Sequence, residues 1–163
     1  MDDLLAVLGR ERHALGNLLF RLLEARNLLA TGEARFLHLI ASDIDAAAEA
    51  VREVELARVL LTPVASGLTL RELAIAARPP IDGILDDHRL AISRLAGEVG
   101  AATETVSDMA QRLRARVRDN RLVSAGRVGA VDDLDREIIV AGYGAVLNAS
   151  ARLTLPSLVR FLG

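Results

Sequence analysis

Apolar residues recur every seven positions over most of the first 118 residues. These residues form three rows: one at the start of the chain, one after Gly32, and a longest row that starts at Leu85. A second row, from His88 to Arg116, is interleaved with the longest row. The main rows are Leu8, Leu15, Leu22 and Leu29; Leu37, Ile44 and Val51; and Leu85, Ile92, Val99, Val106 and Leu113. A seven-residue apolar repeat is typical of helices packed along their length. The pattern predicts an all-α protein, an antiparallel bundle of three long, coiled-coil-like helices.

The first two rows are out of phase, because Leu29 and Leu37 are eight residues apart. Thr31-Gly32 lies in this gap. A glycine in the left-handed conformation ends a helix and lets the chain reverse, whereas a glycine that stays helical costs only about 1 kcal/mol. We favour a reversal at Gly32, with a kinked continuous helix as the alternative.

Pro63 ends or bends the second helix, and Thr69-Leu70-Arg71-Glu72 fits a capping box that begins a short connecting helix. Pro79-Pro80 stops this helix, and Pro80 suits the first turn of the next. A third helix over about 80–118 would be about 58 Å long, and each earlier one roughly 40 to 45 Å, at ~1.5 Å per residue. Its far end should therefore overhang the others.

The pattern changes after residue 118, where glycines and Pro156 interrupt the apolar runs. Asp132 or Asp133 can cap a short helix through Ile138, Ile139 and Val140. We therefore expect a helical bundle at 1–118 and a partly helical C-terminal tail at 119–163. This tail is too apolar to be a freely solvated end.

Composition narrows the function classes. Hydrophobic residues make up 52% of the 163 residues and aromatic residues 2%, which favours interdigitated helices over a sheet sandwich. Cysteine is absent, which excludes disulfides and thiol chemistry. All basic residues are Arg, and the net charge of -2 gives no overall attraction to nucleic acid or anionic lipid. The acidic Met1-Asp2-Asp3 start and the lack of a membrane-length apolar run predict a cytoplasmic protein without membrane insertion.

The sequence contains no pattern that predicts catalysis, a metal site or a cofactor. Glu-x-x-His spacing and the Gly-x-Ser-x-Gly elbow are both missing. Asp86-Asp87-His88 brings acids and an imidazole together only in sequence, because adjacent helical residues point in different directions. We expect His88 to fill a position in the apolar seam. The arginines between Arg112 and Arg121 spread around a helix, so a solvated face is favoured over a nucleic-acid site.

The order of these parts resembles the FlgN family of flagellar export chaperones over roughly residues 4–118. The residues that carry the resemblance are Leu18-Leu19, Leu22-Leu23-Glu24, Thr31-Gly32-Glu33, Phe36-Leu37, Thr69-Leu70-Arg71-Glu72-Leu73, Pro79-Pro80 and Ile84-Leu85-Asp86-Asp87-His88-Arg89. The resemblance implies a cytoplasmic, non-enzymatic chaperone that uses no cofactor. It would bind the C-terminal helical segments of hook-filament junction (hook-associated) proteins, keep them soluble and deliver them to the export gate.

An amphipathic client helix needs an apolar groove. We place this groove on the overhanging part of the third helix, at Val99, Val106, Met109, Leu113 and Val117. The alternative is that these rows simply pack on the first two helices. In the tail, we expect Ile138, Ile139, Tyr143 and Leu147 to dock over the groove until a client displaces them, or to join a homodimer. The rival function is a structural coiled coil or homo-oligomeric scaffold without an export role.

Overall fold

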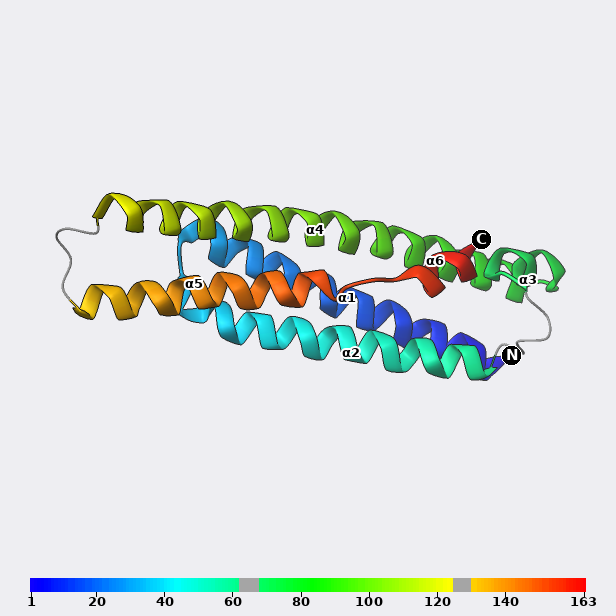
Figure 1. Ribbon diagram of the computed structural model, residues 1–163. Helices are drawn as coiled ribbons and strands as arrows, with labels where there is room; N and C mark the ends of the chain where they lie inside the picture. Colours follow the sequence, from blue (N-terminus) through cyan, green and yellow to red (C-terminus); the bar gives the residue numbers. More distant parts are fainter. Residues whose placement is uncertain (62–67, 125–129) are drawn as a thin grey trace. The chain divides into compact units, whose positions relative to one another are not determined.

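The computed structural model describes residues 1–61, 68–124 and 130–163, and within these ranges it contains helices and no strand. The elements are α1 (Asp2–Thr31), the 3-10 helix η1 (Ala34–Phe36), α2 (Leu37–Leu61), α3 (Leu70–Ala76), α4 (Ile81–Ser124), α5 (Ala130–Ala151) and α6 (Pro156–Leu162) (Figure 1). The prediction of an all-α helical bundle is confirmed.

The chain forms two compact units, each assembled from separated segments. The first unit comprises Met1–Leu19, Ala46–Gly100 and Thr154–Gly163, and the second comprises Phe20–Asp45 and Ala101–Leu153. The helices α1, α2 and α4 therefore contribute residues to both units. The division into a bundle at 1–118 and a tail at 119–163 stays a prediction.

The predicted seven-residue rows supply the cores of the two units. The buried row members are Leu8, Leu15, Val51, Leu85, Ile92 and Val99 in the first unit, and Leu22, Leu29, Leu37, Ile44 and Val106 in the second. Removing such side chains from water stabilises the fold by about 25 cal/mol per Å² of apolar surface. The interleaved row is less buried, with His88 and Met109 half-buried and Arg116 exposed.

The predicted reversal after α1 is confirmed. Gly32 has a φ of 77°, and the backbone N–H of Glu33 donates to the carbonyl of Leu28 at 3.0 Å. This left-handed glycine with a bond reaching back five residues is the Schellman arrangement that ends helices. α2 then runs antiparallel to α1, as ion pairs between Arg21 and Asp43 in the second unit, and between Glu11 and Arg58 in the first, show.

The capping box before α3 is also confirmed. Thr69 Oγ1 accepts a hydrogen bond from the N–H of Glu72 at 3.2 Å, and Glu72 Oε2 accepts one from the N–H of Thr69 at 2.8 Å. The hydrogen bonds that the N–H and the hydroxyl of Thr69 donate to the Glu72 carboxylate lower the pKa of Glu72. Pro80 lies just before α4, where its carbonyl accepts a hydrogen bond from the N–H of Ile84. It therefore precedes the first turn that it was expected to occupy.

Helix α5 corrects the expectation of only a short helix near residues 138–140. It spans 22 residues and passes through both Gly142 and Gly144. A Cβ atom built on Gly142 would lie 3.1 Å from Leu37 Cβ and 3.4 Å from the Ala34 carbonyl oxygen. Gly142 thus allows α5 to pack closely against the start of α2, and this packing outweighs the low helix propensity of glycine.

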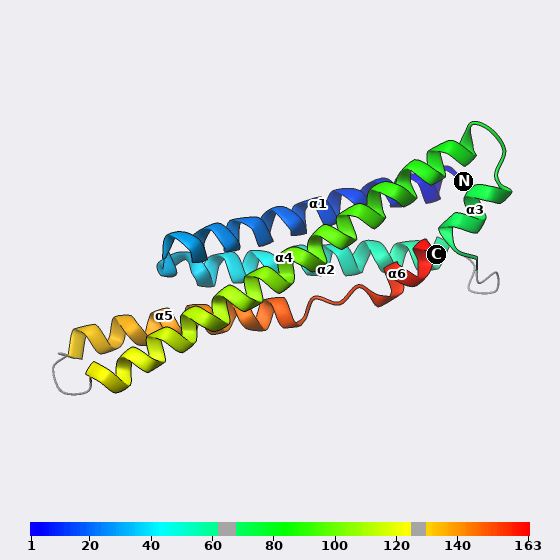
Figure 2. The same ribbon diagram turned by 90° about the horizontal axis from the view of Figure 1, so that it is seen from above.

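Helix α4 is likewise longer than expected, with 44 residues that end at Ser124 and not near residue 118. Within the second unit, α5 accompanies the C-terminal part of α4 (Figures 1 and 2). The Arg114 guanidinium carbon lies 3.9 Å from the position that a Cβ of Gly144 would take. The part of α4 that was expected to overhang therefore has α5 as a neighbour.

Candidate functional site

The expected client groove on α4 is only partly accessible. Val99 and Val106 are buried, so the alternative that these rows pack inside the protein holds for both residues. Met109, Leu113 and Val117 are half-buried. The prediction of an open groove is corrected at Val99 and Val106, because their sequence spacing could not reveal that neighbouring helices cover them.

The tail residues selected from the sequence lie on α5, in the second unit. Ile138 is exposed, Ile139 is half-buried, and both line a shallow hollow together with the turn from Gly32 to Arg35. Tyr143 is buried, which raises the pKa of its hydroxyl, and Leu147 is half-buried. These positions bring α5 against η1, while a role in a homodimer stays a prediction.

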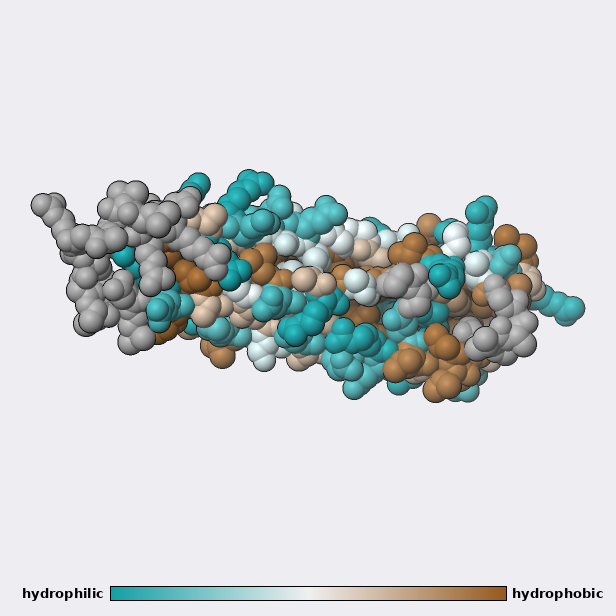
Figure 3. Space-filling model, in the orientation of Figure 1, coloured by the Kyte–Doolittle hydropathy of each residue, from teal (hydrophilic) through white to brown (hydrophobic). Residues whose placement is uncertain are grey.

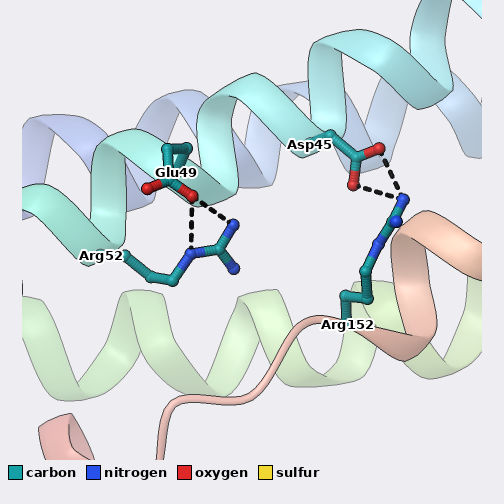
Figure 4. A network of polar contacts seen from close by, with 4 residues as sticks. All are labelled: Asp45, Glu49, Arg52 and Arg152. Carbon is teal, nitrogen blue, oxygen red and sulfur yellow. Dashed lines mark hydrogen bonds and ion pairs between the residues drawn. The ribbon is translucent and has the colours of Figure 1, made fainter.

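An ion pair also attaches the end of α5 to α2 in the second unit. The Nη2 atom of Arg152 donates to both carboxylate oxygens of Asp45, at 2.9 and 2.7 Å (Figure 4). Both side chains are substantially exposed, so this pair contributes on the order of 1 kcal/mol or less. The contact orients the chain as it leaves α5.

The most unusual chemistry of the first unit is a buried ion pair between α1 and α2. Arg58 Nε donates to Glu11 Oε1 at 3.1 Å, and the side chains are 3% and 0% exposed. A second carboxylate, that of Glu55, lies 3.6 Å from the same guanidinium group. The ring of Phe161 from α6 covers the guanidinium face, with its centroid 4.0 Å from the central carbon.

Burial dominates the electrostatics of Glu11. Loss of water raises its pKa, although the Arg58 charge and hydrogen bond oppose this shift. Glu11 Oε2 is buried and has no hydrogen-bond partner among the described residues. A buried ion pair with incomplete hydrogen bonding contributes little net stability, and removing either partner alone is costly.

Sequence reasoning did not identify this pair, although a signal was present. Glu11 lies seven residues after Leu4 and seven before Leu18, while Arg58 lies seven residues after Val51. Both charges therefore occupy positions of the apolar repeat. When two neighbouring helices each carry an opposite charge at such a position, the two charges are expected to form a buried pair. Polar residues at core positions of coiled coils are a comparable case.

Several exposed apolar side chains of α2 lie close together at its C-terminal end, in the first unit. Leu56 is 65% exposed, Leu60 is 85% exposed, and Val59 lies between them at 39%. We call these three residues the leucine face. Figure 3 shows apolar side chains gathered over this part of α2. A cluster of this kind, at i, i+3 and i+4 spacing, is typical of a protein-binding surface.

His88 lies in the first unit, half-buried as expected for its seam position. Burial and the Arg12 charge lower its pKa, and its Nδ1 atom has no hydrogen-bond partner among the described residues. Within those residues, no three His, Cys, Asp or Glu side chains are grouped so that they could hold a metal ion. None of the described helices combines the length and apolarity needed to cross a membrane.

Comparisons with known proteins return no match. No family model matches the chain, no curated protein is similar to it, and no solved structure resembles its fold at a significant level. Among the described residues, the leucine face and the buried ion pair are the two most distinctive features.

Proposed function

We propose that this protein is a cytoplasmic chaperone for helical export clients, of the flagellar type. Its clients are the C-terminal helical segments of hook-associated junction proteins, which it keeps soluble for export. The resemblance over residues 4–118 suggests this client class. The leucine face is the single structural observation that carries the proposal.

The leucine face has the form that a helix-binding surface requires. Leu56 and Leu60 are one turn apart on α2, and exposing them to water is unfavourable unless a partner covers them. An amphipathic client helix can cover both with its own leucines at matching spacing.

A polar border accompanies the leucine face. Arg52 Nη2 and Glu49 Oε2, one to two turns earlier on α2, form an exposed ion pair at 2.6 Å (Figure 4). Apolar centres with polar rims are the usual anatomy of protein interfaces.

Calorimetry with a purified C-terminal helical fragment of a junction protein tests the proposal. We expect one fragment to bind per chain, and the Leu56→Asp/Leu60→Asp double variant to bind about tenfold or more weakly, because two anchors become charged. Leu39→Asp is the matched control, since Leu39 is an equally exposed leucine of α2, at 66%, outside the leucine face.

These binding measurements test separately whether the protein binds the client and where on the protein the client binds. Absence of binding to every junction-protein fragment contradicts the proposed function. Equal weakening by Leu39→Asp and by the double variant shows that the leucine face is not the site. Weakening by Met109→Asp or Leu113→Asp instead places the client on the half-buried row of α4.

A further inference from the structure

Helix α6 presents one apolar face to the rest of the first unit. Leu158, Phe161 and Leu162 are buried at i, i+3 and i+4 spacing, whereas Val159 and Arg160 are exposed. The non-helical residues 153–155 precede it, and Figure 1 shows α6 as a short red helix after this extended segment. A helix of seven residues is not stable alone, so α6 depends on the surface beneath it.

We call this surface the α6 seat, and it includes Arg58 and α3. Phe161 stacks on the Arg58 guanidinium at 4.0 Å, and α6 contacts α3. A Cβ atom built on Gly163 would lie 3.0 Å from Thr69, the residue that caps α3. The seat thus presents the flat, cationic guanidinium group of Arg58 to an aromatic ring.

Two opposing effects act on α6. Burial of Leu158, Phe161 and Leu162 holds it down. Its Phe161 ring also covers the face of the Arg58 guanidinium and keeps water away from it. When α6 leaves this surface, water can solvate the Arg58 guanidinium, and this offsets part of the lost apolar burial. The two effects together reduce the cost of replacing α6 by another helix.

We propose that the α6 seat is a second docking site for an amphipathic helix of another protein, and that α6 occupies this site until the partner helix displaces it. The incoming helix carries leucine, aromatic and leucine anchors at i, i+3 and i+4, as α6 does. Its aromatic ring takes the place of Phe161 over the guanidinium. This inference rests on the proposed function, because the client supplies the helix.

The charges of the seat define the partner further. Glu11 Oε1 and Glu55 Oε1 lie 3.1 and 3.6 Å from nitrogens of Arg58, so acidic partners already occupy the edges of the guanidinium group. Its face remains for a ring, which cation–π attraction favours. An additional carboxylate would meet two existing ones. We therefore expect a partner helix whose docking face carries no acidic side chain.

A labelled peptide tests whether the seat accepts a helix in trans. The probe is a fluorescein-labelled peptide of residues 153–163, and its anisotropy is measured with the full chain. We expect the Leu158→Ala/Phe161→Ala double variant to bind the peptide about tenfold or more tightly than the original chain, because its own α6 competes less. Val159→Ala is the control and should bind like the original chain, since Val159 is 64% exposed.

Equal peptide binding by the double variant and the original chain, with unchanged helical circular dichroism, overturns the inference. If the double variant loses its helical signal, hydrogen exchange of the original chain decides. Exchange of the α6 amides well before those of α1 supports the inference. Exchange only at the rate of global unfolding overturns it.

A competition experiment keeps the two proposals distinguishable. Displacement of the peptide by the junction-protein fragment supports both. If the fragment binds the original chain but never displaces the peptide, the α6 seat is not a client site, although the proposed function stands. If the peptide binds as expected and no fragment binds at all, the proposed function fails while the seat remains a helix-binding site.

Discussion

Two charged residues, Glu11 and Arg58, lie in the core of the first unit, where the apolar repeat would otherwise place leucines. Their hydrogen bond and the Phe161 ring compensate part of the cost of removing both charges from water. The two charges depend on each other, and their mutual dependence can be measured.

We expect Arg58→Leu to destabilise the fold by about 3 to 5 kcal/mol, because it leaves the buried Glu11 carboxylate without its counter-charge. Glu11→Leu should destabilise the fold by less, because the Glu55 carboxylate still lies 3.6 Å from the Arg58 guanidinium. The Glu11→Leu/Arg58→Leu double variant should be close to the original chain in stability, or above it. Urea unfolding measures all three free energies. A double variant as unstable as the sum of the single variants would contradict this description of the pair.

The raised pKa of Glu11 gives a pH dependence with a definite sign. The Glu11 carboxyl binds a proton more tightly in the folded state than in the unfolded state, where the pKa of a Glu carboxyl is about 4.3. The stability that Glu11 contributes is therefore full below that value and declines as the pH rises through the folded pKa.

A comparison with Glu11→Gln isolates this contribution, because the other titratable groups are common to both proteins. We expect the free energy of unfolding of the original chain to fall relative to that of Glu11→Gln as the pH rises above about 4. Denaturant unfolding across the acid range provides the measurement. If the free energy of unfolding of the original chain instead rises relative to that of Glu11→Gln, the Arg58 charge, and not burial, determines the direction of the Glu11 pKa shift.

The buried ion pair could be predicted from the sequence only in part. Glu11 and Arg58 were visible as charges within the apolar repeat, but their spacing alone could not show that they meet. Their contact depends on the helix register that the Gly32 turn sets, and that register is a three-dimensional property. The covering ring of Phe161 comes from more than 100 residues later in the chain, where no repeat pointed to it.

Among the elements, the long helices with clear apolar repeats were predictable, as were the turn at Gly32 and the capping box of α3. Each depends on local chemistry that is readable in a few residues. α5 was not predictable in full, because its glycines are typical helix breakers. Position 142 favours glycine because Leu37 and Ala34 lie so close that a larger residue would crowd them.

Alanine substitutions separate these two roles of glycine. We expect Gly142→Ala to destabilise the fold by about 1 to 3 kcal/mol through overpacking, since Leu37 Cβ and the Ala34 carbonyl belong to the backbone region and cannot rotate away. Gly100→Ala in α4 is the control. It has nothing within 4 Å of the added Cβ, and it should stabilise by up to about 1 kcal/mol.

Thermal and urea unfolding of the two variants provide the measurement. Stabilisation by Gly142→Ala would mean that α5 does not approach α2 closely at this position. Opposite signs for the two substitutions would confirm that close packing, and not the local propensity, keeps Gly142 within α5.

For the whole molecule, the sequence predicted the all-α class but not the distribution of accessible surface. The α4 row from Val99 to Val117 was expected to be open, yet Val99 and Val106 are buried. Leu56 and Leu60, at the C-terminal end of α2, are exposed instead, and the apolar repeat gave no reason to select them. Exposure depends on which helices cover which faces, and a periodic pattern does not contain that information.

A chaperone function requires that the leucine face bind a different protein and not a second copy of this chain. The most direct test is the mass, by light scattering after gel filtration, of the chain mixed with a junction-protein C-terminal fragment. We expect a complex that contains one fragment per chain and that the Leu56→Asp/Leu60→Asp variant does not form. A chain that elutes as a self-associated oligomer without fragment, and dissociates in that variant, would contradict the chaperone function and support a scaffold.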